Sequence, residues 1–248
     1  MTTLLVAMMT ASTEVVSILL EYGANVNCVD VMGNDSFMIA SLFGRPENME
    51  CWLEKVKGWD LNRQNTVIGS YAMSVGVYQG SKKLETVKVL LDAGASLEYR
   101  TFSGSSVITN AVDNEDADPD IVRLLLQVLK ERLDGMKNTL NFKSIVNYRC
   151  KPWRWKRRVI NNCAKLIFRV GMTTNSSLVA YLAIKSGTTA LNLAVMRGDV
   201  EIVKILLEFG ADPYVENDLG MNAFEMCDEA GPFPTVRKVL ERKRVCHK

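Results

Sequence analysis

The sequence predicts an all-α solenoid of stacked helix-turn-helix units that carries a basic helical insertion. Three observations lead to this prediction. A helical phrase recurs along the chain, the longest break in its spacing coincides with a block of positive charge, and 48% hydrophobic with 23% charged residues is the composition of an ordinary globular protein. With 248 residues, the chain is long enough for one or two domains with a substantial core.

The recurring phrase reads EVVSILLEYGANVN from Glu14, ETVKVLLDAGASLE from Glu85, DIVRLLLQ from Asp120 and EIVKILLEFGADPY from Glu201. Each copy begins with an acidic residue, which is favourable at the positive end of a helix dipole, and continues with apolar residues at helical spacing. Three of the four copies end at a glycine, the residue preferred just beyond a helix C-terminus. Each copy therefore predicts a short amphipathic helix with a defined end.

A shorter apolar segment precedes these helices, most clearly in the stretch from Ser186 to Pro213, and Gly187 to Gly220 spans 33 residues. This stretch resembles the ankyrin-repeat family, whose unit is a turn followed by two antiparallel helices over about 33 residues. The positions that match the family pattern G-x-T-P-L-H-x-A and E-I-V-x-L-L-L-x-x-G-A-D are Gly187, Thr189, Ala190, Leu191, Ala194, Gly198, Glu201, Ile202, Val203, Leu206, Leu207, Gly210, Ala211 and Asp212. Asn192 replaces the family's motif histidine, so we expect weaker inter-repeat turns.

Looser repeats extend in both directions from this one. The breaks between the first four fall near Asp30, Asn65 and Tyr99, and a last repeat begins at Asn217. We therefore predict about four ankyrin-like repeats over 1–149, the first of them truncated, a basic amphipathic helical insertion or strongly diverged repeat over 150–184, and two C-terminal ankyrin-like repeats over 185–248.

The two ends of the predicted stack differ. An end repeat needs a polar outer face, and the C-terminal ERKRVCHK meets this need. At the other end, Met1 falls inside the first repeat and the apolar TLLVAMM follows at once. We therefore expect a chain that starts within a solenoid, or one whose first repeat packs against something else.

Positive charge is concentrated in the break. From Gly135 to Gly198 there are twelve Lys or Arg and no Asp or Glu, so the small net charge of +2 combines a basic block with an acidic remainder. Trp153 to Val170 has a helical pattern with one basic and one apolar face. The residues assigned to the basic surface are Arg154, Arg157, Arg158, Lys165 and Arg169.

Several interpretations of this basic helix stay open. Its apolar stripe could dock on neighbouring repeats and leave the cations solvated, or the block could face the acidic repeats. Residues 151–169 could instead bind an acidic partner or an anionic membrane surface, because Trp and Phe enter lipid interfaces and cations attract anionic headgroups. Nucleic acid is the third possible ligand, since basic residues with aromatic neighbours suit phosphate contact and base stacking.

Catalytic and metal chemistry is not expected. His247 is the single histidine, which removes most histidine-based catalysis and any two-histidine metal site. The acidic run from Asp113 to Asp120 opens with the spacing of a calcium loop but lacks its glycine and its closing acid, so we interpret Asp118 as a helix cap followed by Pro119. We expect a non-enzymatic protein with no cofactor, no metal and no small-molecule substrate.

An intracellular protein, cytoplasmic or nuclear, is the simplest interpretation of the cysteine pattern and of the chain start. The six cysteines are scattered without CxxC spacing, and the sequence opens without a charged segment or a cleavage pattern. The longest apolar runs are far shorter than the roughly 18 residues that a membrane span needs.

The resemblance to ankyrin repeats implies a function and a site. Such solenoids bind protein partners on a concave face built from turn tips and inner helices, which predicts a non-catalytic interaction scaffold. A peripheral adaptor whose basic insertion binds anionic lipid or nucleic acid is the alternative. The partner-binding positions that the resemblance implies, with their aromatic and methionine side chains exposed, are Met32, Arg100, Phe102, Leu219 and Met221 at turn tips and Leu42, Phe43, Tyr78, Met196 and Arg197 on inner helices.

Overall fold

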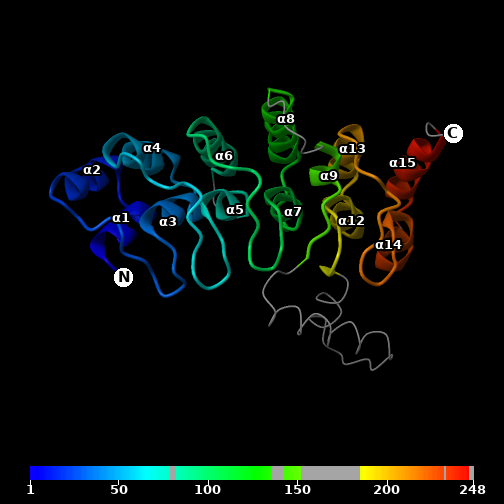
Figure 1. Ribbon diagram of the computed structural model, residues 1–248, viewed down its shortest axis with the longest axis horizontal. Coiled ribbons are helices and arrows are strands. Elements are labelled where there is room, and N and C mark those ends of the chain that lie inside the picture. The colour runs from blue at the N-terminus through cyan, green and yellow to red at the C-terminus, as the bar shows by residue number, and fades with distance from the viewer. Residues whose placement is uncertain (79–81, 136–141, 152–184, 232, 246–248) are drawn as a thin grey trace. The chain divides into compact units, whose positions relative to one another are not determined.

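The computed structural model describes residues 1–78, 82–135, 142–151, 185–231 and 233–245, and the chain divides into two compact units, Met1–Phe102 and Ser103–Lys248. The regular secondary structure of these described ranges is helical, apart from an isolated bridge between Val29 and Asp35. The helices follow one another in pairs (Figure 1), so the prediction of an all-α fold made of repeated helix pairs is confirmed. No helix in these ranges has the length and apolar composition to cross a bilayer.

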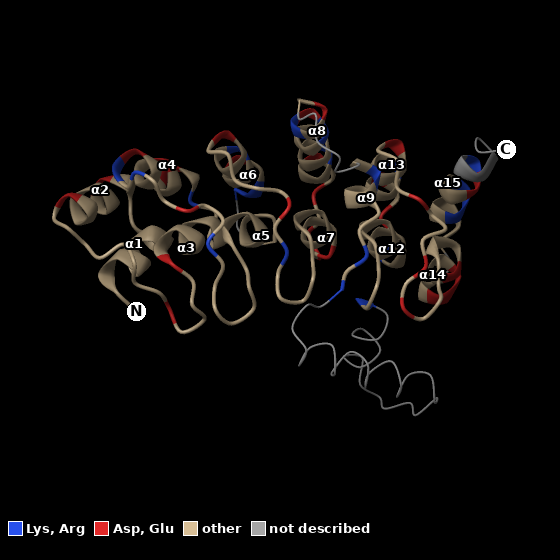
Figure 2. Cartoon of the chain, viewed as in Figure 1, with Lys and Arg blue, Asp and Glu red and all other residues tan. Residues whose placement is uncertain are grey.

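The first unit is built from helix pairs in which we call the first helix inner and the second outer. The inner helices are α1 (Thr3–Thr10), α3 (Ser36–Leu42) and α5 (Ala72–Gly76), and the outer helices are α2 (Thr13–Glu21), α4 (Pro46–Lys55) and α6 (Lys83–Asp92). Inner helices pack on inner helices and outer on outer, in chain order. The inner helices contain no charged residue, whereas Lys, Asp and Glu are found on the outer helices (Figure 2). Burial of the uncharged row therefore forms the core of this unit.

The second unit repeats the same plan. Its elements are α7 (Val107–Val112), α8 (Pro119–Gly135), α9 (Phe142–Val146), α12 (Ala190–Met196), α13 (Val200–Glu208), α14 (Ala223–Ala230) and α15 (Pro234–Val245). The pair α7 and α8 packs directly against the pair α12 and α13, which in turn packs against α14 and α15. Asp118 accepts the Asp120 N–H at 2.8 Å, and Pro119 begins α8, so the acidic run starts a helix as we interpreted it.

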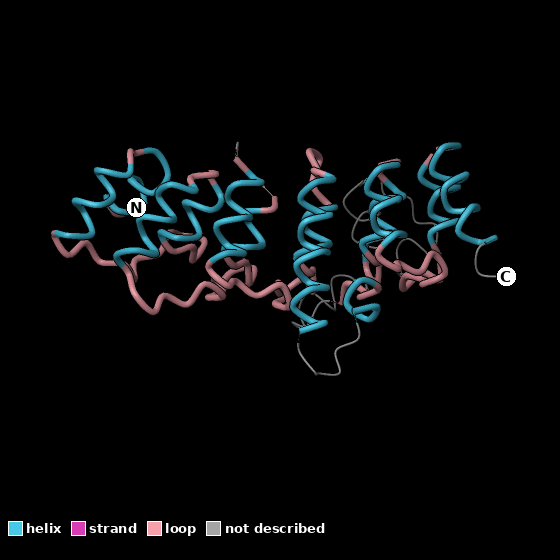
Figure 3. The backbone as a smooth tube through the Cα atoms, turned by 90° about the horizontal axis from the view of Figure 1, so that it is seen from above, coloured by secondary structure: helices cyan, strands magenta, loops and turns pink. Residues whose placement is uncertain are grey.

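Each helix pair is joined to the next by a hairpin loop, which we call a finger. A backbone N–H donates to a carbonyl across the base of four fingers, from Asp30 to Asn34, Asn65 to Ser70, Cys150 to Thr188 and Asn217 to Met221. Counted along the chain, with the finger that contains Gly104 as the third, the finger between Cys150 and Thr188 is the fourth. It has the same kind of closing bond as the others in this list, although the chain between its two partners includes residues 152–184. Figure 3 shows the long loops of the first unit gathered along one edge of its helices.

Each finger contains a glycine with a positive φ, and in all but the last finger the next finger packs closely against it. These glycines have φ between +71° and +82°, a region that side chains disfavour. In the first four fingers, a Cβ added to this glycine would collide with one residue of the next finger. The pairs are Gly33 with Thr66, Gly69 with Phe102, Gly104 with Lys151 and Gly187 with Asp218, whereas Gly220 in the last finger has no atom within 4 Å of such a Cβ.

Candidate functional site

The first finger presents two apolar side chains on a rigid turn. Asp30 Oδ1 accepts the backbone N–H groups of Met32 and Asn34, each at 2.8 Å, and Asn34 Nδ2 donates to Asp30 Oδ2 at 3.0 Å. These bonds replace chain flexibility by a fixed turn. Val31 is 97% exposed at its tip and Met32 is 42% exposed.

The second finger is tied to the first. Asn65 Nδ2 donates to Asn34 Oδ1 at 2.8 Å, and the Asn65 side-chain oxygen accepts the N–H of Ile68 at 3.0 Å. Both asparagines are buried, so this bond lies in a low-dielectric place where it is strong. Val67, two residues after Asn65, remains 46% exposed.

The inner helices add two aromatic side chains. Phe43 follows the last residue of α3, Tyr78 lies just beyond α5, and both are 45% exposed, while Leu42 is half-buried. Because α3 packs against α5, these residues come from neighbouring helices of one row. We call five exposed apolar residues, which lie in the fingers or at the ends of the inner helices of this unit, the finger face: Val31, Met32, Phe43, Val67 and Tyr78.

Two predicted finger residues are placed differently from a binding tip. The prediction that Phe102 is exposed is wrong: it is 7% exposed, because its ring lies against Gly69 in the preceding finger. Arg100 is half-buried, and its guanidinium donates to the carbonyls of Glu98 at 2.5 Å and Tyr99 at 3.0 Å. Phe102 therefore connects two fingers, and the charge of Arg100 is used within its own turn.

The predicted residues of the second unit lie at the end of α12 and in the last finger. Met196 is half-buried, and Arg197 is exposed with its Nη2 donating to the Glu115 carbonyl at 2.8 Å. Leu219 and Met221 are half-buried, and their backbone N–H groups donate to the side-chain oxygen of Asn217 at 2.9 and 3.0 Å. The basic-surface residues Arg154, Arg157, Arg158, Lys165 and Arg169 lie outside the described residues.

Sequence reasoning missed Val67. Its finger reads NTVIGS and the first reads DVMGND, so the shared apolar-apolar-glycine order was a usable signal. The irregular spacing between repeats hid it, because a fixed step of 33 residues from Val31 ends at Gln64, short of Val67. Alignment on the glycine instead of on repeat length places Val67 with Val31 and Met32.

The described residues offer little chemistry. They contain no group of three or more His, Cys, Asp or Glu side chains that could hold a metal ion. Burial raises the pKa of the thiols of Cys51, Cys150 and Cys227, which disfavours the nucleophilic thiolate.

Asp35, at the base of the first finger, is a buried carboxylate with one satisfied oxygen. Its Oδ1 caps α3 by accepting the Met38 N–H at 2.9 Å, and its Oδ2 is buried with no hydrogen-bond partner among the described residues. Burial raises the pKa of Asp35, although the Met38 N–H and the Arg63 guanidinium act in the opposite direction.

This raised pKa predicts a pH effect. Between the ordinary aspartate pKa and the higher folded value, the folded state holds more protons than the unfolded state, so stability falls as pH rises, by up to about 1.4 kcal/mol per pH unit. Asp35→Asn keeps a helix-capping side chain of equal quality but has no proton that ionises as pH rises. We expect the variant to lack this decline in urea unfolding followed by circular dichroism. An unchanged slope would assign the effect to another carboxylate.

Comparison with known proteins finds ankyrin repeats within this chain. The family model described as Ankyrin repeat matches residues 1–31 and 186–218. The chain is 33% identical over 112 residues to "Ankyrin repeat and SAM domain-containing protein 6" of Rattus norvegicus, covering 44% of this chain and 12% of that protein. The chain thus spans about an eighth of the length of that relative.

Solved structures show the same fold. The ankyrin repeat domain of Bcl-3 has a TM-score of 0.64 at 23% identity, with 96% of this chain and 81% of that chain covered. A chain in the complex of the predatory endopeptidase Bd0816 from Bdellovibrio bacteriovorus with immunity protein Bd3460 has a TM-score of 0.63 at 19% identity, covering 98% of each chain. Identities this low establish the fold alone.

Proposed function

Because the chain is an ankyrin-repeat protein, we propose that it is a non-catalytic interaction scaffold that binds an apolar segment of a partner protein on the finger face. The observation that carries the proposal is the finger face itself. Five apolar side chains are exposed on fingers and inner helices whose own positions are held by buried side-chain hydrogen bonds. The inner helices beside them carry no charge that a partner would have to desolvate.

The chemistry of the finger face suits a protein partner. Phe43, Tyr78 and Met32 belong to the residue types that are enriched at interface centres, where a few anchors carry most of the binding energy. The bonds of Asp30 and Asn65 fix the fingers before binding, so little ordering entropy is lost when a partner arrives. Ankyrin repeats in general mediate protein–protein contacts, which supports this choice.

Absence of catalysis and an intracellular location belong to the same proposal. Cys28, Cys51, Cys150 and Cys227 are free thiols in the described ranges, which suits a reducing compartment. The raised pKa of the buried thiols disfavours nucleophilic chemistry and so supports a binding role.

We further propose that residues 150–184 are an insertion rather than a diverged repeat. The pair α12 and α13 stacks directly on α7 and α8, so no repeat separates them. Cys150 exchanges two backbone bonds with the far side of its finger, to Thr188 and from Gly187, each at 2.8 Å. Arg149 adds a third bond across this base, because its Nε donates to the Gly187 carbonyl at 3.2 Å. In this proposal the basic segment belongs to the connection between Cys150 and Gly187 and is not a repeat of its own.

That placement supports a second candidate function, in which the basic insertion binds anionic lipid or nucleic acid. Counterion release makes such binding steeply dependent on salt, whereas apolar contact is not. The two functions therefore differ in a measurable way, and they use different residues.

The test compares full-length variants in affinity capture from an extract of the organism's own cells. We expect Met32→Glu/Phe43→Glu/Val67→Glu to reduce recovery of at least one protein by more than about tenfold, since buried charge removes several anchors at once. Recovery of that protein by the wild type should persist from about 0.1 M to about 0.5 M salt. The three substituted side chains are exposed, so the thermal unfolding midpoint should change little.

Two controls separate the candidates. Lys88→Glu places a glutamate at an exposed position of the outer helix α6, away from the finger face, and should leave this recovery intact. Arg154→Glu/Arg157→Glu/Arg158→Glu should abolish only salt-sensitive binding to RNA or to vesicles of phosphatidylserine. If the finger-face variant retains every protein that the wild type retains, the finger face is not the binding surface.

A further inference from the structure

The outer surface of the first helix pair exposes an apolar stripe. On α2, Val15 is 44%, Ile18 53% and Tyr22 88% exposed, and their spacing places them on one helix face. The opposite face of α2 packs against α4. The residues of α1 that the sequence suggested as uncovered, such as Leu4 and Met8, are buried. Apart from Val6 of α1, which is 40% exposed, the uncovered apolar side chains of these two helices therefore belong to α2 and its C-terminal end.

The chain contains a covered counterpart of this stripe. The phrase of α13, EIVKILLEFG, matches EVVSILLEYG of α2, so Ile202, Ile205 and Phe209 stand where Val15, Ile18 and Tyr22 stand. There, Ile202 is fully buried, Ile205 is 2% exposed and Phe209 is half-buried.

The cover of α13 is a preceding helix pair. The helix α8 packs against α13, and the ring of Phe142 in α9 lies 6.2 Å from the ring of Phe209. Equivalent side chains are thus buried where a preceding pair is present and exposed on α2.

The turn that follows an outer helix also differs between covered and uncovered repeats. Asn147 Oδ1 accepts the Asp212 N–H at 2.6 Å, and Asn62 Oδ1 accepts the Ser96 N–H at 2.9 Å. In both cases an asparagine from the preceding repeat holds the turn that follows glycine and alanine. Asn25 follows Gly23 and Ala24 in the same way, and it is exposed.

A cavity lies where that asparagine would enter. Its volume is about 350 Å³, and its lining includes Leu19, Tyr22, Gly23 and Asn25. In α13 the corresponding glycine, Gly210, is approached by the Lys143 side chain, and its carbonyl accepts from Asn147 Nδ2 at 3.3 Å.

We propose that Val15, Ile18 and Tyr22 form a docking surface for a further ankyrin-type helix pair, stacked in register as α7, α8 and α9 stack on α12 and α13. The partner unit supplies an apolar outer helix to cover the stripe. It also supplies an asparagine or a similar acceptor for the Asn25 N–H. This surface is separate from the finger face and does not depend on the function proposed for it.

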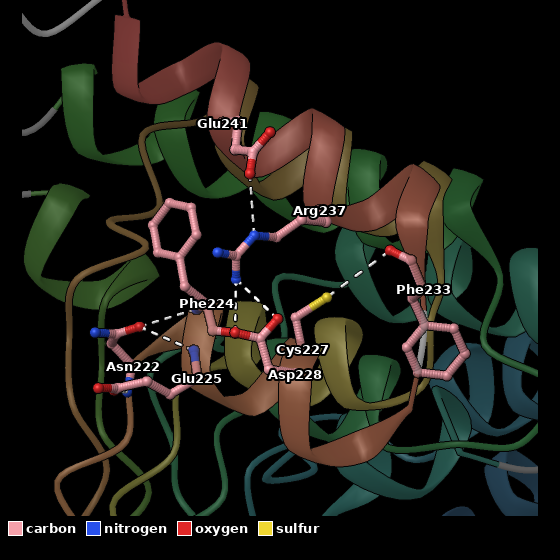
Figure 4. Close-up of polar contacts among 8 residues, drawn as sticks. All are labelled: Asn222, Phe224, Glu225, Cys227, Asp228, Phe233, Arg237 and Glu241. Atoms are coloured by element: carbon pink, nitrogen blue, oxygen red, sulfur yellow. Dashed lines mark hydrogen bonds and ion pairs between the residues drawn. The ribbon is translucent and has the colours of Figure 1, made fainter.

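A second copy of this chain does not supply such a unit from its other end. The last pair is closed by polar groups (Figure 4): Arg237 of α15 binds Asp228 at 2.9 Å and Glu241 at 3.1 Å. The outward positions of α15, Thr235, Lys238 and Glu241, are exposed and carry no large apolar side chain. Two copies that met through the α2 stripe would bring Glu14 and Glu21 of each copy together, which is unfavourable.

The experiment adds the predicted occupant to the full chain. A copy of residues 34–69, which contains α3, α4 and Asn62, is fused in register in front of Met1, and a Gly/Ser linker of equal length serves as control. We expect the added repeat to raise the thermal midpoint by about 5 °C and to slow amide exchange at Asn25 by at least about tenfold, and the linker to do neither.

Ile18→Glu keeps the proposal falsifiable. In the unfused chain Ile18 is exposed, so the variant should melt like the wild type. In the fused chain the same change should remove most of the gain in midpoint, whereas Val67→Glu should not. Unprotected Asn25, or a gain that survives Ile18→Glu, would overturn the proposal. It would also be overturned if sedimentation showed a dimer of the unfused chain that Ile18→Glu dissociates.

Discussion

Gly104→Ala is expected to destabilise the second unit by about 3–5 kcal/mol, more than any change on the finger face, because two penalties coincide. Gly104 has a φ of +81°, where a side chain costs roughly 1–2 kcal/mol. A Cβ there would also overlap the backbone carbonyl of Lys151, at the base of the fourth finger. Backbone cannot move aside as a flexible side chain can. The fourth finger would therefore have to shift away from the third.

The measurement is urea unfolding followed by circular dichroism, with Gly220→Ala as the matched control. Gly220 has the same backbone conformation, with a φ of +82°, and no atom lies within 4 Å of an added Cβ. Its substitution should cost only the backbone strain of about 1–2 kcal/mol. The difference between the two variants isolates the packing of one finger on the next. Equal losses in both would mean that the contact with Lys151 contributes nothing.

The contrast between these glycines also explains which parts of the fold were predictable. The helices α2, α6 and α13 follow from local signals, namely an initial acid, apolar spacing and a final glycine, and α8 follows from the first two of these. Phe102 was misplaced because its environment is set by Gly69, a residue of the preceding finger that is distant in sequence. Local composition does not distinguish the exposed tip of a finger from a contact between two fingers.

The break in the repeat spacing was visible, but its meaning was not. Counting residues between Asp120 and Glu201 indicates extra chain and allows either an insertion or another repeat. The alternatives differ in long-range pairing, since the bonds of Cys150 with Gly187 and Thr188 join residues on either side of the break. Spacing alone carries no information about such pairs.

The uncovered end of the stack shows the same limit. Sequence reasoning expected an apolar end face and attributed it to the segment TLLVAMM. Leu4, Leu5 and Met8 are buried, and the exposed stripe is on α2, whose phrase is almost identical to that of the fully covered α13. Sequence identity between two helices thus predicts the same chemical face, and only the presence of a neighbour decides whether that face is buried.

Trp52 lies at the centre of the first unit and carries the second large expected effect. It is fully buried on α4, its ring lies 6.3 Å from Phe37 of α3, and Trp59 meets it edge-on at 5.1 Å. Trp52→Ala should lower the free energy of unfolding of this unit by about 3–5 kcal/mol, because it removes these contacts and leaves a cavity between an inner and an outer helix.

Trp52→Phe distinguishes aromatic packing from the polar group of the indole. The Trp52 Nε1–H is buried without an acceptor in the described part of the chain, so its removal relieves an unsatisfied donor. Phenylalanine keeps a ring between Phe37 and Trp59. We therefore expect Trp52→Phe to lose less than half of what Trp52→Ala loses in urea unfolding. If the two variants unfolded at the same urea concentration, ring packing at this position would not be what stabilises the unit.

If ring packing is what holds α3 and α4 together, Trp52→Ala should also weaken capture by the finger face. The reason is that Phe43 of the finger face follows α3, and α3 packs against α4. Trp52→Phe keeps this packing and should leave capture unchanged.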